Sequence, residues 1–136
     1  YCRHHVHLDA QRVSPTFFQR ILSGEEIRIW GDGSTVRDYL YISDLVDFLV
    51  KSIHCRLTGV YNVGYGDGAS LREILSLVEE ISGRRANVRY LPSRGFDVRK
   101  VILDISKARQ ALDWAPKVGL PEGCLMYWQW ARGCAS

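Results

Sequence analysis

The sequence lacks the features that mark several large classes of protein. No apolar run approaches the roughly 18 to 20 residues that a membrane span needs, and the first residues, YCRHHVH, do not have the charged and then apolar plan of a secretory signal. The 4 cysteines lie far apart without a CxxC pair, so the sequence indicates neither a zinc ribbon nor a dense disulfide framework. We therefore expect no membrane partner and no export, and a reducing, cytoplasmic location.

An excess of one charge is also missing. The net charge is only +3, and the lysines and arginines are spread along the chain. Binding to a nucleic-acid backbone usually requires a dense basic face, so this distribution favours a small anionic ligand and no nucleic acid. The 136 residues are enough for one ordinary domain. Because the chain begins at Tyr1 without a methionine, we expect it to be a piece of a longer protein.

Catalytic motifs are missing too. None of the lysines has a tyrosine four residues before it, so the chain contains no Tyr-x-x-x-Lys pair. It contains no G-x-S-x-G turn and no HExxH helix either. The sequence alone therefore predicts a binding protein without catalytic residues.

What the sequence does contain is an alternation of strand and helix patterns without internal repeats, which is typical of the α/β class. Strands are expected at 27–30, 36–42, 60–63, 86–91 and 101–103. Helices are expected at 14–23, 45–53, 71–82, 104–112 and 121–132. The expected organisation is an irregular segment 1–12, one domain over 13–132 and a tail at 133–136.

The stretch from 27 to 44, IRIWGDGSTVRDYLYISD, is the most informative one. Residues 27–30 alternate apolar and polar side chains, residues 31–34 are typical of a turn, and residues 36–42 are aromatic or β-branched. This pattern predicts a strand, a tight turn and a second strand. Ser43 and Asp44 are of the types that cap the start of a following helix.

Two short segments carry residues suited to an anion. Arg37 stands just past the glycine turn, where a guanidinium group can hold a phosphate; alternatively, Arg37 and Asp38 form a surface ion pair. Arg94 and Asp97 share a loop in which they can bind a phosphate and sugar hydroxyls, or form only a salt bridge. Trp30 can border a base, or it can belong to the core.

The segment 64–69, GYGDGA, fits the G-x-G-x-x-A form of the dinucleotide fingerprint between a strand and a helix. We interpret it differently, because Ser70 and Glu73 form an S-x-x-E capping box that uses the amide groups a pyrophosphate would need. The acidic residues further on, Glu79 and Glu80, fall inside the expected helix rather than at the end of a second strand. No cofactor is expected at this loop.

Metal-ligand residue types are crowded near the start of the chain. Cys2, His4, His5 and His7 could hold a metal ion if the segment were extended. Terminal histidine clusters are more often solvated, so no metal is expected.

Four segments, read together, carry a more specific signal: RVSPTFFQRILSGE, IWGDGSTVRDYLYISDLVDFLV, GVYNVGYGDGASLREIL and PSRGFDVRKVILDISKARQALDWAPKVGLPEG. Their content and order resemble the C-terminal part of NAD-dependent nucleotide-sugar epimerases and dehydratases, in the extended branch of the short-chain dehydrogenase/reductase superfamily. The similarity runs from about Val13 to Ala131. It implies an α/β substrate-binding portion with a small mixed sheet and flanking helices.

In that family, the N-terminal Rossmann half holds NAD and the Tyr-x-x-x-Lys pair, while the C-terminal part holds the nucleotide diphosphate sugar. The resemblance implies that Arg37 and Arg94 hold the diphosphate from two sides, and that Asp97 meets the ribose hydroxyls. It also implies which residues border the base, namely Arg28, Ile29 and Trp30, with Val13 near them. The Asn-Pro-Tyr-Gly-Pro type of loop that the family has upstream is not matched here beyond Tyr1.

These implications define the expected function. The chain should bind a nucleotide sugar as part of a truncated epimerase or dehydratase, bind no NAD itself and catalyse nothing alone. The first alternative is a structural or oligomerisation module that keeps the fold without a ligand. The second alternative, ranked below it, is a metal-binding element at the N-terminus.

The resemblance also implies uncovered apolar surface. In full-length relatives, the helix after RDYLYI and the strand VYNVG pack on a parallel sheet whose other strands are not in this sequence. Leu45, Phe48, Leu49 and residues 60–63 would then lack their usual cover. We therefore expect a homo-oligomer, or a partner that supplies the Rossmann half.

Overall fold

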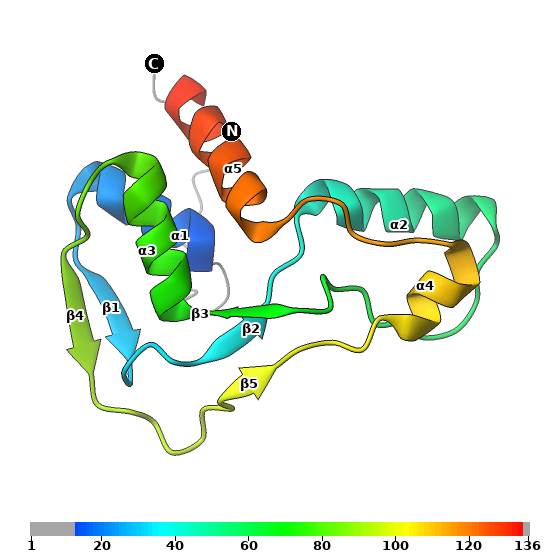
Figure 1. Ribbon diagram of the computed structural model, residues 1–136, viewed down its shortest axis with the longest axis horizontal. Helices are drawn as coiled ribbons and strands as arrows, with labels where there is room; N and C mark the ends of the chain where they lie inside the picture. The colour runs from blue at the N-terminus through cyan, green and yellow to red at the C-terminus, as the bar shows by residue number, and fades with distance from the viewer. Residues whose placement is uncertain (1–12, 135–136) are drawn as a thin grey trace.

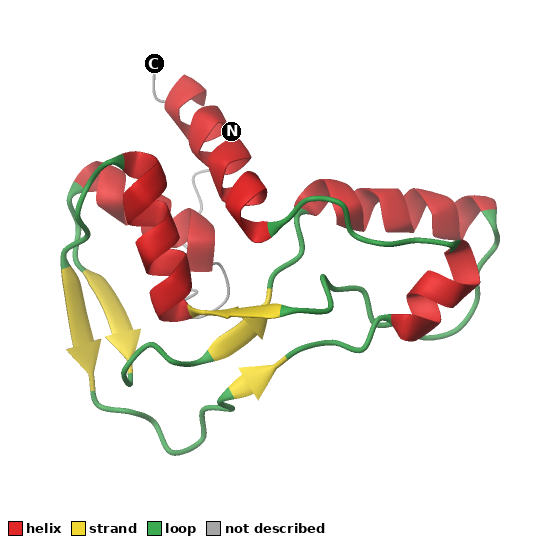
Figure 2. Ribbon diagram, viewed as in Figure 1, coloured by secondary structure: helices red, strands yellow, loops and turns green. Residues whose placement is uncertain are grey.

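The computed structural model describes residues 13–134, which form helices at the two sides of the molecule with short strands between and below them (Figures 1 and 2). This arrangement confirms the α/β class. In chain order, the elements are α1 (Val13–Ser23), β1 (Ile27–Trp30), β2 (Val36–Asp38), α2 (Ile42–His54), β3 (Gly68–Ser70), α3 (Leu71–Ser82), β4 (Val88–Leu91), β5 (Lys100–Val101), α4 (Ser106–Leu112) and α5 (Leu120–Cys134).

The strands of the described chain form two small sheets. In one, β1 and β4 are parallel; in the other, the order is β3-β2-β5, with β2 antiparallel to β3 and parallel to β5. The predicted hairpin of 27–30 with 36–42 is therefore wrong. The Gly31 amide donates to the Leu91 carbonyl and the Val36 amide donates to the Arg99 carbonyl. The connection thus leaves one sheet and enters the other instead of turning back.

The boundary between β2 and α2 also differs from the expectation. The strand ends at Asp38 rather than at residue 42, and α2 begins at Ile42 with Tyr41 in the N-cap position. Ser43 and Asp44 therefore lie inside the first turn and cap nothing.

The carboxylate of Asp44 has a different role. This side chain is buried, and one of its oxygens accepts hydrogen bonds from the amides of Lys117 (3.0 Å) and Val118 (2.9 Å). A buried carboxylate is costly unless it is hydrogen-bonded, so these two bonds satisfy Asp44. They also connect the start of α2 to the segment that leads into α5.

The expected strand at 60–63 is a loop, although its residues have high β propensity. A strand needs a partner, and in the described chain no strand pairs with this segment. The paired segment comes a few residues later, where Gly68 lies opposite Asp38 and Ser70 lies opposite Val36. The sequence pattern had placed Gly68 in a loop and Ser70 only at the start of the following helix.

Helix α3 follows its sequence signals closely. The Ser70 hydroxyl accepts from the Glu73 amide (3.2 Å), and the Ser70 amide donates to the Glu73 carboxylate (2.7 Å), so the predicted capping box is confirmed. The hydrogen bonds that the Ser70 amide and the Ser70 hydroxyl donate to the Glu73 carboxylate lower the pKa of Glu73. At the other end, Gly83 adopts a left-handed conformation with φ 66° and ends the helix.

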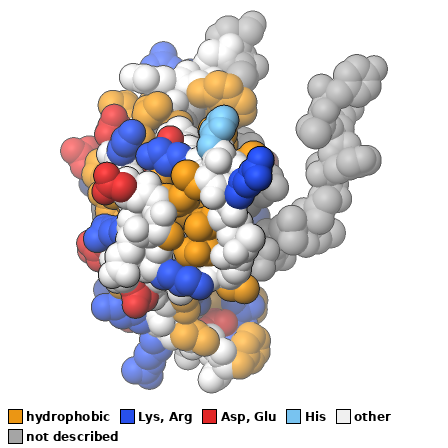
Figure 3. Space-filling view, turned by 90° about the vertical axis from the view of Figure 1, so that its right-hand side faces the viewer, with side chains coloured by type: hydrophobic (Ala, Val, Ile, Leu, Met, Phe, Trp, Pro, Cys, Tyr) orange, Lys and Arg blue, Asp and Glu red, His pale blue; other side chains and the backbone are white. Residues whose placement is uncertain are grey.

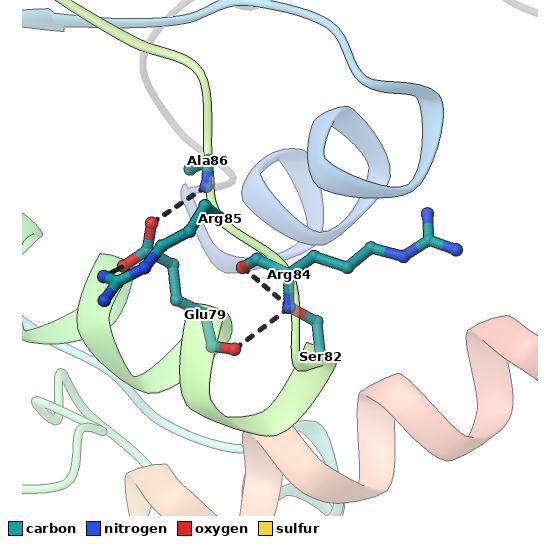
Figure 4. Close-up of polar contacts among 5 residues, drawn as sticks. All are labelled: Glu79, Ser82, Arg84, Arg85 and Ala86. Carbon is teal, nitrogen blue, oxygen red and sulfur yellow. Dashed lines mark hydrogen bonds and ion pairs between the residues drawn. The ribbon is translucent and has the colours of Figure 1, made fainter.

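The carboxylate of Glu79 binds the chain just after the end of α3. The Glu79 carboxylate accepts from the Arg85 guanidinium (3.0 Å) and from the Ala86 amide (2.8 Å), as Figure 4 shows. In the same view, the Ser82 hydroxyl lies between the Glu79 carbonyl and the Arg84 amide. These contacts fold the chain back toward the first residue of β4.

The buried side chains form two clusters. The larger one lies among α1, β1, α3 and α5, and we call this part the α3 lobe. The smaller one lies between α2 and α4, and we call this part the α2 lobe. The larger cluster consists of Phe17, Phe18, Ile21, Ile27, Ile29, Ile74, Leu75, Val78, Cys124 and Trp128. The smaller cluster consists of Phe48, Ile105, Ala108 and Trp114.

The outer surface of the α2 lobe is apolar. Leu49 is 49% exposed and Val60 is 85% exposed, as predicted. Phe48 was expected to lack cover and does not, because its ring packs edge-on against Trp114 at a centroid distance of 5.2 Å. Tyr61 and Val63 were expected to lack cover too, but both are partly buried against the same cluster. Figure 3 shows this end of the molecule, where hydrophobic side chains gather between lysine and arginine side chains.

Candidate functional site

A cavity of about 1060 Å³ opens where β1 and β4 end. Because the two strands are parallel, their carboxyl ends lie at the same edge, which is where α/β proteins commonly bind ligands. The loop after β1, the first turn of α3 and the loop between β4 and β5 complete the walls. The lining residues are Trp30, Gly31, Asp32, Ser34, Thr35, Arg72, Tyr90, Leu91, Ser93, Arg94, Gly95, Asp97 and Arg99.

Arg94 is held in place on two sides. Its Nε donates to the Asp97 carboxylate (3.1 Å), and the Asp97 amide donates to the Arg94 carbonyl (3.1 Å), which closes a turn. The guanidinium carbon lies 4.8 Å from the centre of the Trp30 ring and 5.3 Å from that of Phe96. A guanidinium group held in this way loses little freedom when its remaining N–H groups bind an anion.

The opposite wall joins the loop after β1 to the start of α3. The Asp32 carboxylate accepts from the amide (2.9 Å) and hydroxyl (2.6 Å) of Ser34 and pairs with the Arg72 guanidinium (3.0 Å). Hydrogen bonds from Ser34, together with the charge of Arg72, lower the pKa of Asp32. Asp32 is therefore a carboxylate at neutral pH and neutralises Arg72.

Gly33 makes this junction possible. Its φ is 78°, a conformation that side-chain-bearing residues rarely adopt, and a Cβ built there would lie 3.0 Å from Cγ of Arg72. Its carbonyl accepts from the Arg72 amide (3.1 Å). The turn at Gly33 thus places the loop after β1 against the first turn of α3.

The structure brings together three of the residues that the sequence singled out, because Trp30, Arg94 and Asp97 all line the cavity. Arg94 and Asp97 do form the salt bridge that was the alternative interpretation, and the pair faces the cavity. Trp30 is on the exposed face of β1, not in the core.

The other predicted residues do not line this cavity. Arg28 pairs with Glu26 (2.9 Å), and the Ile29 side chain is buried in the larger cluster. Arg37 lies on β2, where its Nη1 donates to the Val36 carbonyl (2.8 Å). Val13 is the first described residue, and its side chain lies outside the described part of the chain.

Sequence reasoning missed Asp32, Arg72, Tyr90 and Arg99 as cavity residues. Asp32 had been assigned to a turn and Arg72 only to the expected helix 71–82. The sequence did not indicate Tyr90, because the pairing of β4 with β1 joins segments that are far apart in the chain. Nothing in the sequence near Arg99 marks it as a cavity residue.

Asp38, next to Arg37, forms no ion pair with it among the contacts of residues 13–134. Its carboxylate accepts from the amides of Tyr65 (2.7 Å), Gly66 (3.0 Å) and Leu103 (3.2 Å). Tyr65 and Gly66 belong to the glycine-rich segment 64–69. Their amide groups, which a pyrophosphate would need, are therefore already bound to a carboxylate of the chain itself, so this loop does not fit NAD.

Other kinds of site find no support in the described part of the chain. No helix among residues 13–134 is long and apolar enough to cross a membrane. Within the same residues, no group of three or more His, Cys, Asp or Glu side chains is placed to hold a metal ion. The cluster of Cys2, His4, His5 and His7 lies outside the described residues.

Known proteins similar to this chain act on nucleotide sugars. A family model described as GDP-mannose 4,6 dehydratase matches residues 8–127. UDP-arabinose 4-epimerase 1 of Arabidopsis thaliana is 38% identical over 105 residues, which are 74% of this chain and 25% of that protein.

Two solved structures show the same fold. UDP-glucose 4-epimerase of Thermotoga maritima, solved with UDP-glucose, has a TM-score of 0.82 and 38% identity, covering 91% of this chain and 40% of that one. UDP-glucose 4-epimerase of Thermus thermophilus, solved with NAD, has a TM-score of 0.80 and 34% identity, covering 89% of this chain and 40% of that one.

The chain therefore belongs to the GDP-mannose 4,6 dehydratase family, a family of nucleotide-sugar epimerases and dehydratases in the extended branch of the short-chain dehydrogenase/reductases. This finding confirms the resemblance to the C-terminal part of such enzymes. The chain spans about a quarter of the length of the curated relative named above and two fifths of each of the two solved ones.

Proposed function

We propose that this chain binds the nucleotide diphosphate portion of a nucleotide sugar, as the substrate-binding part of an NAD-dependent epimerase or dehydratase. One observation carries the proposal: Trp30, Arg94 and Asp97, from two separate segments, meet in one cavity at the carboxyl ends of parallel strands. The solved relative that contains UDP-glucose supports the choice of ligand class.

Each of the three side chains has a role that suits its chemistry. Arg94 presents its outer N–H groups to the diphosphate, because charge-assisted hydrogen bonds to phosphate are strong. Asp97 accepts from the ribose hydroxyls, and Trp30 borders the base. For Arg37 as a second diphosphate ligand, and for base contacts by Arg28, Ile29 and Val13, the proposal rests on the family resemblance alone.

The proposal assigns no catalytic step to this chain. Its sequence contains no Tyr-x-x-x-Lys pair, and the glycine-rich loop does not fit the dinucleotide. NAD, which a solved relative contains, is assigned to another part of the enzyme. A cytoplasmic location is part of the proposal and agrees with the free, exposed thiol of Cys55.

Calorimetric titration with UDP-glucose, GDP-mannose and dTDP-glucose tests the proposal. We expect at least one of these ligands to bind, and Arg94→Ala to weaken its binding about tenfold or more, because a charge-assisted hydrogen bond contributes about 1.5–3 kcal/mol. Arg109→Ala, which removes the same charge from the exposed face of α4, is the matched control. Absence of binding across the panel would reject the proposal.

The apolar surface of α2 supports a second function, that of an association module. On this one helix, the side chains of Ile42, Val46, Leu49 and Ile53 are 49% to 75% exposed. An apolar face of this kind marks an interface or invites aggregation. The proposed cover is a second copy of this chain or a Rossmann half. A molar mass in sedimentation equilibrium that stays monomeric as the concentration rises would count against the second copy.

A further inference from the structure

Three arginines line the cavity, and they differ in what surrounds their guanidinium groups. Arg72 is paired with Asp32, and Arg94 is paired with Asp97 between two aromatic rings. The third, Arg99, has an exposed side chain that makes no hydrogen bond, ion pair or ring contact with any residue of the described chain. Among the described residues, Arg99 is thus the cation of this cavity that no carboxylate neutralises.

The backbone of Arg99 is nevertheless firmly placed. Its carbonyl accepts from the Val36 amide (2.9 Å), and the next residue, Lys100, pairs with Val36 at the start of β5. Arg99 therefore lines the cavity from a fixed point at the edge of the three-stranded sheet. A side chain held at its base and free at its tip can reach a bound ligand without first breaking a contact within the protein.

The charged side chains that line the cavity do not balance one another. Among the described lining residues, three arginines stand against two aspartates, which leaves one positive charge in excess. An anion that approaches Arg72 or Arg94 also approaches the carboxylate paired with that arginine, whereas at Arg99 it meets no such repulsion. The electrostatic attraction for phosphate is therefore strongest at Arg99.

We propose that Arg99 binds a phosphate group of the nucleotide in this cavity, together with Arg94. This inference rests on the proposed function and adds to it a phosphate ligand that the sequence motifs did not mark. It adds a cation at the start of β5 to the one on β2, Arg37, that the family resemblance implies.

The test uses pyrophosphate, UDP and uridine as probes in calorimetric titrations. We expect Arg99→Gln to raise the dissociation constants of pyrophosphate and UDP about tenfold and to leave that of uridine unchanged, since only a phosphate contact is lost. Arg89→Gln is the matched control, because Arg89 is an exposed arginine of β4 that does not line the cavity. Circular dichroism and the melting temperature verify that each variant is folded.

The outcomes separate this inference from the proposed function. If UDP binds and Arg99→Gln changes its affinity less than twofold, the role of Arg99 is overturned and the proposed function stands, with Arg37→Gln as the next variant to titrate. If Arg99→Gln raises the dissociation constant of uridine as much as that of UDP, Arg99 shapes the cavity and binds no phosphate. If pyrophosphate binds in an Arg99-dependent manner but no nucleotide sugar binds, the proposed function fails and the phosphate contact stands.

Discussion

The α3 lobe and the α2 lobe are built from the same kinds of elements, but they differ in how completely they are covered. In the α3 lobe, helices pack on both sides of α3 and on β1, so the larger cluster is enclosed by the chain itself. In the α2 lobe, one helix face packs on α4 and the other faces solvent. Most of the cavity lining comes from β1, β4, α3 and their loops, so the candidate site is attached to the self-contained lobe.

The comparison predicts that the largest loss of stability comes from the centre of the α3 lobe. Phe18 is fully buried and stacks on Trp128 at a centroid distance of 5.5 Å. We expect Phe18→Ala to lower the free energy of unfolding by about 3–5 kcal/mol, because it removes apolar contacts and leaves a cavity. Urea unfolding monitored by circular dichroism measures this quantity. Phe96→Ala, at an exposed phenylalanine, is the control and should change the value little.

A loss below about 1 kcal/mol for Phe18→Ala would contradict the comparison, because burial of this extent corresponds to several kcal/mol. It would mean that the α3 lobe is not the more tightly packed half.

An intermediate effect is expected where the α2 lobe is fastened to α5. Asp44→Ala leaves the amides of Lys117 and Val118 without their acceptor, and we expect a loss of about 2 kcal/mol. Asp44→Asn keeps an oxygen at the same position and should lose less. Thermal unfolding of the two variants side by side measures the difference. Equal losses would show that the charge, and not the hydrogen bonds, matters at this position.

The smallest effect is expected on the outer face of α2. Leu49→Gln replaces a half-exposed leucine with a good helix former, so the free energy of unfolding should change by less than about 0.5 kcal/mol. Phe48 is one residue earlier but is buried against Trp114, so Phe48→Gln should lower the free energy of unfolding several times more. Urea unfolding of both variants provides the measurement. A loss of 2 kcal/mol or more for Leu49→Gln would show that a partner covers this face in solution.

The sequence predicted best where the signal is local. The capping box of Ser70 with Glu73 and the left-handed Gly83 define α3 within a few residues, and both were read correctly. The hairpin failed because strand partners are chosen by distant segments: β1 pairs with β4, and β2 pairs with β3 and β5. The strand expected at 60–63 failed for the same reason, since β propensity without a partner strand forms no sheet.

The candidate site shows the same limit. Arg94 and Asp97 are three residues apart, so their pairing was foreseeable from the loop alone. Asp32 and Arg72 are 40 residues apart, and nothing near either residue indicates that the fold joins them. Arg99 enters the cavity only because β5 pairs with β2, which is again a choice made by distant parts of the chain.

One consequence concerns the order in which the molecule can be completed during synthesis. The Asp38 carboxylate accepts hydrogen bonds from the amides of Tyr65, Gly66 and Leu103, which are 27, 28 and 65 positions further along the chain. Until the ribosome has delivered Lys100 and Val101, which form β5, the middle strand β2 has one edge without its neighbour, and such edges invite pairing with other nascent chains. The centre of this protein is therefore finished late, after the helix that follows it has already emerged.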